Sequence, residues 1–367
     1  MKNKYLAAEV ETSQGNYRVI VGKNILDLLG KELEFTGIKK KTCFIIADKS
    51  MFPKKVKLLH ETMESFGYKT NTFSLELSEE NKNYNSVSKI YDWLSTMKAE
   101  RTDFILSFGG GVAGDIIGFA ASSYLRGMPY IQVPTTLASM TDAAIGGKTG
   151  YNLATGKNLV GSFNQPKLVF EDLDFLQTLP IREKNSGWAE AIKHALISDV
   201  NLFEEFESNK INIINLDTEY AAEILKKSVR IKAQVVSKDE FERGQDRIKL
   251  NYGHTIGHAI EKVTKFKKYL HGEAVSMGMM VSINISLNLG IVNTDTVERQ
   301  KNILTNYGLP TNDKNLNTEE LLEAIQMDKK NVDGKVRWVL LRNIGEAIIE
   351  DNVSLDVVKS SISKIIY

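Results

Sequence analysis

The sequence has one cysteine and six prolines in 367 residues, and its charges almost cancel. The single cysteine, Cys43, excludes an intrachain disulfide and a zinc site built from several thiolates. Lysine and arginine number 47 and aspartate and glutamate 46, so the net charge is +1. That balance argues against a nucleic acid or an anionic membrane as the partner. At about 150 residues per domain, the length favours two globular domains.

Two further stretches bear on location. The apolar patch near the N-terminus is broken at once by Glu9 and Glu11, which is too polar for a signal-peptide core, so we expect a cytoplasmic protein. Residues 274–294 carry no charge and are long enough to raise a membrane span. Because serines and asparagines recur inside this stretch, we interpret it as a buried helix.

Strand-like and helix-like stretches alternate through the first half of the chain. Strands are expected at 42–48, 69–77, 103–108, 129–133 and 167–172, and helices at 50–66 and 83–98. This alternation is typical of an α/β layer with a mostly parallel sheet. After about residue 181, helix-forming stretches dominate, with one strand-like segment at 337–341. We therefore predict an α/β nucleotide-binding domain at 1–180 and a mainly α-helical metal- and substrate-binding domain at 181–367.

A glycine-rich turn follows the strand expected at 103–108. Gly109, Gly111 and Gly114 match the pattern G-x-G-x-x-G, in which glycines let the backbone approach a pyrophosphate at a helix N-terminus. A turn needed only for tight packing of strand and helix remains an equal alternative. The acid expected about 20 residues later is absent, and the acid lies instead at Asp48 in an earlier strand. A nucleotide would therefore bind differently from the first-turn Rossmann pattern.

The segment 146–150, GGKTG, resembles part of a phosphate-binding Walker loop. That loop needs a glycine at the position of Asp142, so the ATPase interpretation fails. Asp142, Lys148, Lys157 and Asn158 in a glycine-rich stretch suit a small anionic substrate, and a solvated loop remains the alternative.

Three of the five histidines, His254, His258 and His271, fall within eighteen residues. His254 and His258 are four apart and would share a helix face, and no Glu follows His254, which excludes the H-E-x-x-H protease pattern. Such a cluster favours a metal site. Catalytic metals held by imidazoles often take one carboxylate and keep an open position. Glu190, on an apolar helix, is the candidate carboxylate, with a solvated helix face as its alternative.

A family resemblance rests on several motifs that occur together and in order. The segments are GGGVAGDIIGFAASSYLRG, VPTTL, GGKTGYN, GKNLVGSF, GWAEAIKHALI, NYGHTIGHAIE and LHGEAV. They resemble the 3-dehydroquinate synthases, which are sugar-phosphate cyclases with a fold similar to that of glycerol dehydrogenases. The resemblance implies conversion of 3-deoxy-D-arabino-heptulosonate 7-phosphate to 3-dehydroquinate in the shikimate pathway. Bound NAD would oxidise an alcohol transiently, phosphate would leave by β-elimination, and re-reduction and an aldol closure would follow.

The resemblance also implies a set of site residues. The metal, zinc or cobalt, would be held by Glu190, His254 and His271, while His258 would face the substrate. Substrate contacts would be Asp142, Lys148, Asn158, Lys193, Lys232, Glu242, Arg247, Asn251, His258 and Lys330, with Arg126 reaching a neighbouring subunit in a homodimer. NAD contacts would be Asp48, Glu79, Lys82, Gly109, Gly110, Gly111, Asp115, Thr135, Thr136, Lys148, Lys157 and Thr178.

The chain departs from the family pattern before Arg247. The stretch DEFERGQDR has one extra residue and places Asp246 next to the predicted carboxylate anchor, which leaves the placement of Glu242 and Arg247 open. Alternatives are an amino-dehydroquinate synthase, a 2-deoxy-scyllo-inosose synthase, and a glycerol dehydrogenase-like oxidoreductase. Arg247 and Asn251 together favour a substrate that carries a carboxylate.

Overall fold

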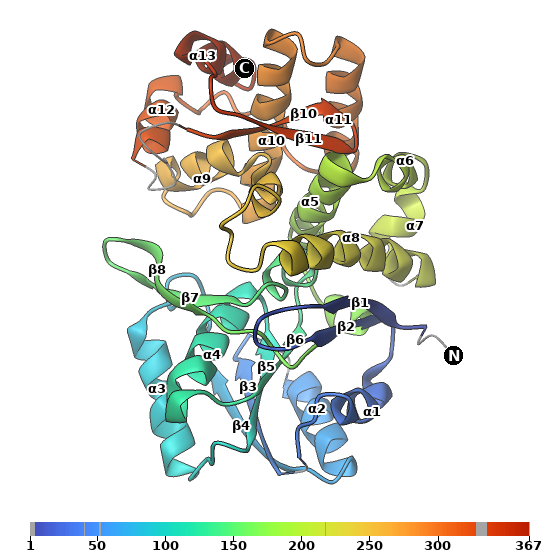
Figure 1. Cartoon of the computed structure of the whole chain (residues 1–367), viewed down its shortest axis with the longest axis vertical. Helices are drawn as coiled ribbons and strands as arrows, with labels where there is room; N and C mark the ends of the chain where they lie inside the picture. Colours follow the sequence, from blue (N-terminus) through green and yellow to red (C-terminus); the bar gives the residue numbers. More distant parts are fainter. Residues whose placement is uncertain (1–3, 40, 51–52, 217, 328–335, 367) are drawn as a thin grey trace. The chain divides into compact units, whose positions relative to one another are not determined.

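The computed structural model describes residues 4–39, 41–50, 53–216, 218–327 and 336–366 (Figure 1). The chain forms two compact units. Unit 1 contains Met1–Leu179 and Leu216–Phe241, and unit 2 contains Pro180–Asn215 and Glu242–Tyr367. The segment Leu216–Phe241 therefore belongs with the N-terminal unit, whereas the predicted division at residue 180 assigns it to the second domain.

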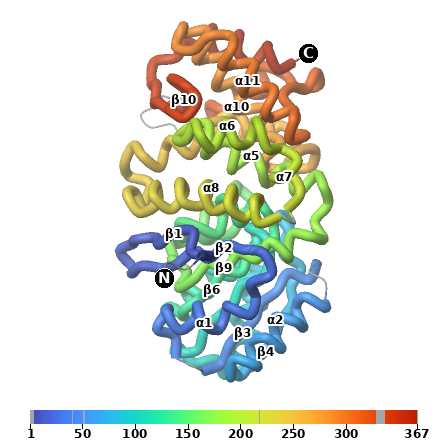
Figure 2. Tube along the Cα trace, turned by 90° about the vertical axis from the view of Figure 1, so that its right-hand side faces the viewer, coloured from blue at the N-terminus to red at the C-terminus, as the bar shows by residue number. Residues whose placement is uncertain are grey.

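Helix α8 (Glu219–Lys238) explains this difference. It packs against strands β1 (Leu6–Val10) and β2 (Tyr17–Gly22) of unit 1 (Figure 2). The Lys226 ammonium donates to the Lys4 carbonyl at 2.8 Å, and the Glu11 amide donates to the Ser237 hydroxyl at 3.0 Å. Sequence order alone does not reveal that a later helix returns to the first sheet.

Unit 1 contains a seven-stranded sheet in the order β1-β2-β9-β6-β5-β3-β4. Its other strands are β3 (Thr42–Asp48), β4 (Lys69–Leu75), β5 (Phe104–Gly109), β6 (Tyr130–Pro134) and β9 (Leu168–Asp172). Every neighbouring pair is parallel except β1–β2. The five predicted strands are confirmed, with ends that move by one or two residues, whereas β1 and β2 were not predicted.

Helices cover both faces of this sheet. Helices α1 (Leu29–Glu34) and α2 (Pro53–Ser65) share one apolar cluster with the sheet. Helices α3 (Tyr84–Thr96) and α4 (Gly111–Ser123) share the other. Outside the main sheet, β7 (Lys148–Leu153) and β8 (Gly156–Phe163) form an antiparallel hairpin. The predicted α/β class is confirmed for this unit.

Unit 2 is mainly helical, as predicted. Its helices are α5 (Ile181–Ser198), α6 (Val200–Ser208), α7 (Lys210–Ile214), α9 (His254–Val263), α10 (His271–Asn288), α11 (Thr294–Asn306), α12 (Thr318–Gln326) and α13 (Leu355–Ser363). The predicted strand becomes β10 (Trp338–Asn343), which pairs with β11 (Glu346–Glu350). The uncharged stretch begins inside α10, whose residues 272–286 are all buried, and no described helix could cross a membrane.

Two glycines let α10 approach the start of α9. Gly253 precedes α9 with a φ of 80°, a left-handed conformation that glycine adopts without steric cost. A Cβ atom on Gly278 would lie 1.9 Å from the Gly253 carbonyl oxygen, so a side chain there would force the helices apart. This close approach holds the first residue of α9, His254, in a fixed position beside α10.

Candidate active site

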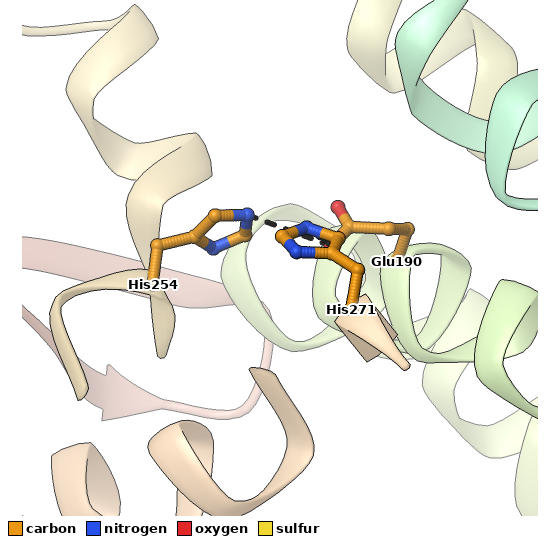
Figure 3. Close-up of side chains that lie close together, drawn as sticks. All are labelled: Glu190, His254 and His271. Carbon is orange, nitrogen blue, oxygen red and sulfur yellow. Dashed lines mark ion pairs between the residues drawn. The ribbon is translucent and has the colours of Figure 1, made fainter. Parts of the chain in front are cut away.

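Three elements of unit 2 bring the predicted metal ligands together. Glu190 lies in α5, and His254 and His271 are the first residues of α9 and α10. The Nε2 atoms of His254 and His271 lie 3.5 and 3.6 Å from the same Glu190 oxygen, Oε1 (Figure 3). One possible ligand atom from each of the three residues lies within 4.8 Å of the other two. These three residues therefore form a group that could hold a metal ion.

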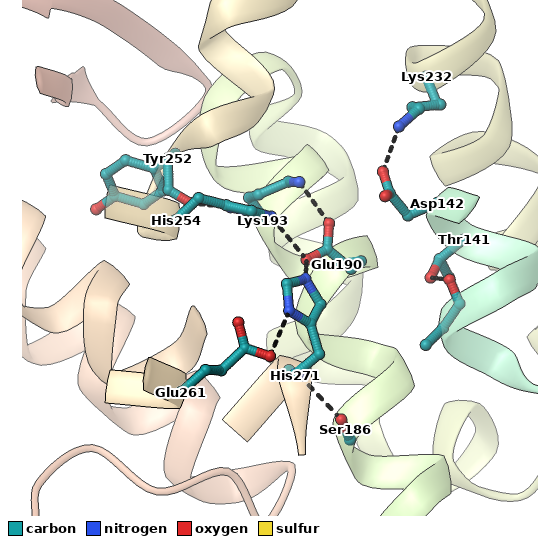
Figure 4. Close-up of polar contacts among 12 residues, drawn as sticks. Thr141, Asp142, Ser186, Glu190, Lys193, Lys232, Tyr252, His254, Glu261 and His271 are labelled. Carbon is teal, nitrogen blue, oxygen red and sulfur yellow. Dashed lines mark hydrogen bonds and ion pairs between the residues drawn. The ribbon is translucent and has the colours of Figure 1, made fainter. Parts of the chain in front are cut away.

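The far nitrogen of each imidazole has an acceptor beside it. His254 Nδ1 lies 3.2 Å from the Tyr252 carbonyl, and His271 Nδ1 lies 3.4 Å from Glu261 Oε1 (Figure 4). When Nδ1 carries the proton and donates to these acceptors, Nε2 carries the lone pair on the side of Glu190. Glu261 was not predicted. The available signal was its position seven residues after His254, two turns along the same helix face.

Glu190 fits a cation at this point. Its side chain is 1% exposed, and within the described residues its Oε1 accepts no hydrogen bond. Its other oxygen, Oε2, contacts the Lys193 ammonium. A buried carboxylate oxygen facing two imidazole nitrogens is costly unless a cation joins them. Catalytic zinc sites have three protein ligands and keep a fourth position for water or substrate, and the predicted set has three.

His258 lies close to this cluster but outside the group that contains Glu190. Its ring centroid is 5.4 Å from that of His254 and 6.1 Å from that of His271. It forms a second possible ligand group with Glu261 and His271. The four-residue spacing of His254 and His258 therefore does not define the pair of histidines that meets Glu190, and a substrate contact by His258 stays a prediction.

The residues around Arg247, where the chain departs from the family pattern, differ in burial. Arg247 is 2% exposed and begins a 3₁₀ turn, Arg247–Asn251. Asp246 is exposed, and its carboxylate lies 3.9 Å from the Lys249 ammonium. Asn251 Nδ2 donates to Glu242 Oε1 at 3.4 Å. Asp246 is therefore exposed, whereas the predicted anchor, Arg247, is buried. Lys330 lies outside the described residues.

In unit 1 the glycine turn lies at a point where the connections change direction. From β3 the chain runs through α2 to β4, which lies on one side of β3. From β4 it returns through α3, on the opposite face of the sheet, to β5 on the other side of β3. In open α/β sheets, ligands bind at the carboxyl ends of the strands at such a point. Asp48 ends β3 and Gly109 ends β5, and a Cβ on Gly109 would lie 3.3 Å from the Asp48 Cβ and 2.5 Å from that of Ala113. The turn therefore meets the packing requirement and has the position of a nucleotide site.

A paired set of charges lies on unit 1 beside the β7–β8 hairpin. The Lys82 ammonium, which is buried, contacts the Asp115 carboxylate and lies 2.6 Å from Asn158 Oδ1. Burial raises the pKa of Asp115, and the Lys82 charge opposes that effect. Lys157 Nζ lies 3.0 Å from Glu79 Oε1. The structure thus groups five predicted residues.

Asn152, also on the hairpin, was missed by the sequence analysis. Its Nδ2 donates to Glu79 at 2.9 Å, and its Oδ1 accepts from the Asn158 amide at 2.9 Å. Partial burial of Glu79 would raise its pKa, but the Asn152 hydrogen bond and Lys157 outweigh it, and the pKa is lowered. The glycine-rich, polar hairpin lacks the apolar run by which the main strands were recognised.

The remaining predicted residues of unit 1 are less tightly grouped. Asp142, in a π-helical turn (Ser139–Ala143), contacts the Lys232 ammonium of α8, whereas Lys148 is exposed. Thr136 packs against Gly110, whose added Cβ would lie 3.0 Å from the Thr136 methyl. Thr135 is buried, and Thr178 accepts a hydrogen bond from Lys55 at 3.3 Å. Arg126 has a left-handed φ of 63° in the turn after α4.

Solved structures define the class of fold. A 2-epi-5-epi-valiolone synthase from Streptomyces hygroscopicus subsp. jinggangensis 5008, solved with NAD+ and Zn2+, superposes with a TM-score of 0.86 and 25% identity over 95% of this chain and 96% of that chain. A 2-deoxy-scyllo-inosose synthase in complex with carbaglucose-6-phosphate, NAD+ and Co2+ has the same fold, with a TM-score of 0.83 and 22% identity over 97% and 99% of the two chains. The chain thus has a dehydroquinate synthase-like fold.

Sequence relatives are more specific. Residues 72–186 match the family 3-dehydroquinate synthase N-terminal, and residues 187–331 match 3-dehydroquinate synthase C-terminal. A 3-dehydroquinate synthase from Prochlorococcus marinus (strain MIT 9215) is 41% identical over 347 residues, which cover 94% of this chain and 95% of the relative. The chain belongs to the 3-dehydroquinate synthase family.

Proposed function

We propose that this chain is a 3-dehydroquinate synthase, a carbon–oxygen lyase that converts 3-deoxy-D-arabino-heptulosonate 7-phosphate to 3-dehydroquinate and phosphate. Full-length similarity to synthases of that name supports the proposal. The observation that carries it is the convergence of His254 and His271 on Glu190 Oε1, which accepts no hydrogen bond in the part of the chain that the structure describes. These residues would supply the metal centre that oxidation of a substrate alcohol needs.

NAD+ and Zn2+ or Co2+, the groups present in the solved cyclases, are the cofactors we propose. A bound metal would act as a Lewis acid on a substrate oxygen, and NAD would take up and return a hydride. Glu190, His254 and His271 would hold the metal. The glycine turn of unit 1, with Asp48 and the residues that pair around Lys82 and Glu79, would bind NAD.

The chain's cations would bind the substrate. A phosphate and a carboxylate carry about three negative charges near neutral pH. In unit 2, buried Arg247 can bind a carboxylate with two parallel hydrogen bonds, and Lys193 is held beside Glu190. In unit 1, Asp142 orients the Lys232 ammonium. A buried guanidinium that meets a carboxylate favours the heptulosonate over glucose 6-phosphate, which has none.

One assay tests the proposal against its alternatives. Purified protein is incubated with NAD+, Zn2+ and the heptulosonate phosphate, and released phosphate, dehydroquinate and NADH are followed together. We expect phosphate and dehydroquinate in equal amounts with no net NADH. Turnover of glucose 6-phosphate instead would indicate an inosose synthase, and NADH accumulating with glycerol would indicate a dehydrogenase. The amino-substituted heptulosonate phosphate, run in parallel, identifies an amino-dehydroquinate synthase.

The proposal extends to location and assembly. We propose a cytoplasmic homodimer in which Arg126 reaches the partner's substrate phosphate. Light scattering of the purified chain measures its mass in solution. Mixing an Arg126→Ala chain with a chain inactive through Glu190→Gln tests the crossing contact. In a mixed dimer, one site would combine an intact Glu190 from one chain with an intact Arg126 from the other, so the mixture would be more active than the sum of the two separate variants.

A further inference from the structure

The nine residues 262–270 connect two parts of the metal centre, and we call them the basic loop. They contain four lysines, Lys262, Lys265, Lys267 and Lys268, and no acid. The residues on either side are Glu261 and His271, whose side chains meet at 3.4 Å. The loop therefore begins after the acceptor of His271 and ends at His271 itself, a predicted metal ligand, although the chain as a whole has a net charge of only +1.

Lys265 in this loop has a left-handed backbone conformation, which glycine would adopt with less steric strain. The Phe266 amide donates to the Glu261 carbonyl at 2.7 Å and the Lys265 amide to the Lys262 carbonyl at 3.0 Å. These two bonds define a Schellman motif at the end of α9, in which the left-handed residue is usually glycine. Here Lys265 and Phe266 both have a φ of 56°. A side chain in this conformation is strained, and strain kept in a structure is a reason to look for function.

Three of the four lysines make no ion pair within the described residues, and one of these, Lys262, donates to the Met327 sulfur at 3.7 Å. The Lys268 ammonium contacts the Asp313 carboxylate. Lys265 and Lys267 are exposed and make no ion pair in the described part of the chain. Phe266, between them, is 43% exposed. The loop thus presents positive charge to solvent within six residues of His271, a predicted metal ligand.

We propose that the basic loop attracts the anionic substrate to the metal centre, so that Lys265 and Lys267 raise the local concentration of phosphate- and carboxylate-bearing sugars. This inference rests on the proposed function. Cations near a site increase the encounter rate of anions, and the effect falls with ionic strength. The two lysines are positioning residues that need not touch the bound substrate.

The first test neutralises both charges. In Lys265→Gln/Lys267→Gln, we expect kcat/KM for the heptulosonate phosphate to fall roughly three- to tenfold at low salt. We expect kcat to stay unchanged and the difference to vanish near 1 M KCl, where the Debye length is about 3 Å. The control, Lys31→Gln/Lys89→Gln, removes two exposed lysines of unit 1 and should leave kcat/KM at the wild-type value.

The second test separates steering from a structural role. A lysine near a helix C-terminus also stabilises the helix dipole, so a structural Lys265 would lower the melting temperature when lost. We expect the opposite from Lys265→Gly, because glycine relieves the left-handed strain. This variant should melt higher than wild type and yet lose part of its kcat/KM at low salt. A lower melting temperature with unchanged kcat/KM would overturn the proposal.

A third readout needs no turnover. In Phe266→Trp, we compare the quenching of tryptophan fluorescence by anionic iodide with its quenching by neutral acrylamide. The ratio of iodide to acrylamide quenching should be higher in Phe266→Trp than in the same variant that also carries Lys265→Gln and Lys267→Gln. An equal ratio would contradict a local positive potential. If wild type does not turn over the heptulosonate phosphate, the proposed function fails and this inference fails with it. Turnover with the same salt dependence in all variants overturns the steering role alone.

Discussion

Two buried glutamates, one in each unit, differ in what surrounds them. Glu171 lies in β9 at the carboxyl end of the sheet, is 0% exposed, and within the described residues neither of its oxygens accepts a hydrogen bond. Glu190 in α5 is 1% exposed and also has one such oxygen. Around Glu190, however, are the Lys193 ammonium and two imidazole nitrogens.

The comparison shows that an unsatisfied buried carboxylate does not by itself make a site. Burial alone raises the pKa of Glu171 well above its usual value, so this side chain avoids the cost of a buried charge by keeping its proton. Glu190 instead lies among groups that can share a cation with it. The nitrogen atoms around Glu190, rather than its burial, distinguish the predicted metal ligand from Glu171.

The largest expected effect comes from removing the charge of Glu190. Glu190→Gln keeps the size of the side chain but replaces the anionic ligand oxygen, so we expect bound metal to be lost and kcat/KM to fall on the order of 10³-fold, about 4 kcal/mol. Metal content after dialysis and steady-state rates measure this. Glu171→Gln is the matched control and should keep its metal. A Glu190→Gln enzyme that retained stoichiometric metal and full activity would contradict the ligand assignment.

A smaller effect is expected from Glu171→Leu, which should increase the free energy of unfolding rather than reduce activity. The unfolded chain releases this proton near pH 4.5, whereas the folded state holds it to higher pH. Between those two pKa values the unfolded state binds fewer protons, so wild-type stability falls as pH rises, by about 1.4 kcal/mol per pH unit. Leucine removes this loss. Urea denaturation at about pH 5 and pH 7 should show the advantage of the variant growing with pH, and a constant difference would refute it.

Next in size is Glu261, whose carboxylate sets the orientation of His271. Glu261→Gln should weaken metal binding roughly tenfold to a hundredfold, because second-shell acceptors fix the tautomer and raise the basicity of a ligating imidazole. Competition with a chelator measures the affinity. The protein should still bind zinc when it is in excess, which distinguishes an orienting residue from a ligand. Affinity equal to wild type would remove Glu261 from the centre.

The smallest effect is expected where a carboxylate is satisfied by the protein itself. Asn152→Ala removes one hydrogen bond to Glu79 and one from the Asn158 amide. At about 1 kcal/mol per bond, we expect the dissociation constant of NAD to rise roughly fivefold to thirtyfold. Titration of NAD by fluorescence measures it, with Asn83→Ala, which caps α3, as a control for stability alone. An unchanged constant would separate the hairpin from NAD binding.

Much of the fold was predictable because its central strands are continuous apolar runs. The strands at 42–48, 103–108, 129–133 and 167–172 are buried on both faces and stand out for that reason. Strands β1 and β2 contain charged residues such as Glu9 and Arg18 and form the antiparallel edge, so no apolar run marks them. The return of α8 to unit 1 depends on packing between distant segments, which periodicity does not encode.

The site shows the same division. The sequence pattern predicted a metal centre from scarce histidines, and the family resemblance separated His254 and His271 from His258. Neither identified Glu261, because an acid in an amphipathic helix is ordinarily solvated. Its role became visible only from the 3.4 Å distance to a histidine ten residues away. The seven-residue spacing from His254 places Glu261 on the same helix face, but that spacing does not say that the side chain meets His271.

The late arrival of α8 has a consequence for how the protein is made. Unit 1 needs Ser237 and Glu240, which bind the amides of Glu11 and Ser13. During synthesis, the part of the first sheet that α8 covers therefore stays exposed after residue 179 has been made. It can be covered only after the ribosome has translated 36 residues of the other unit and then α8 itself. A nascent chain stopped at residue 179 should remain bound to chaperones, whereas one stopped after 241 should be released with a protease-resistant first unit and a cleavable segment at 180–215.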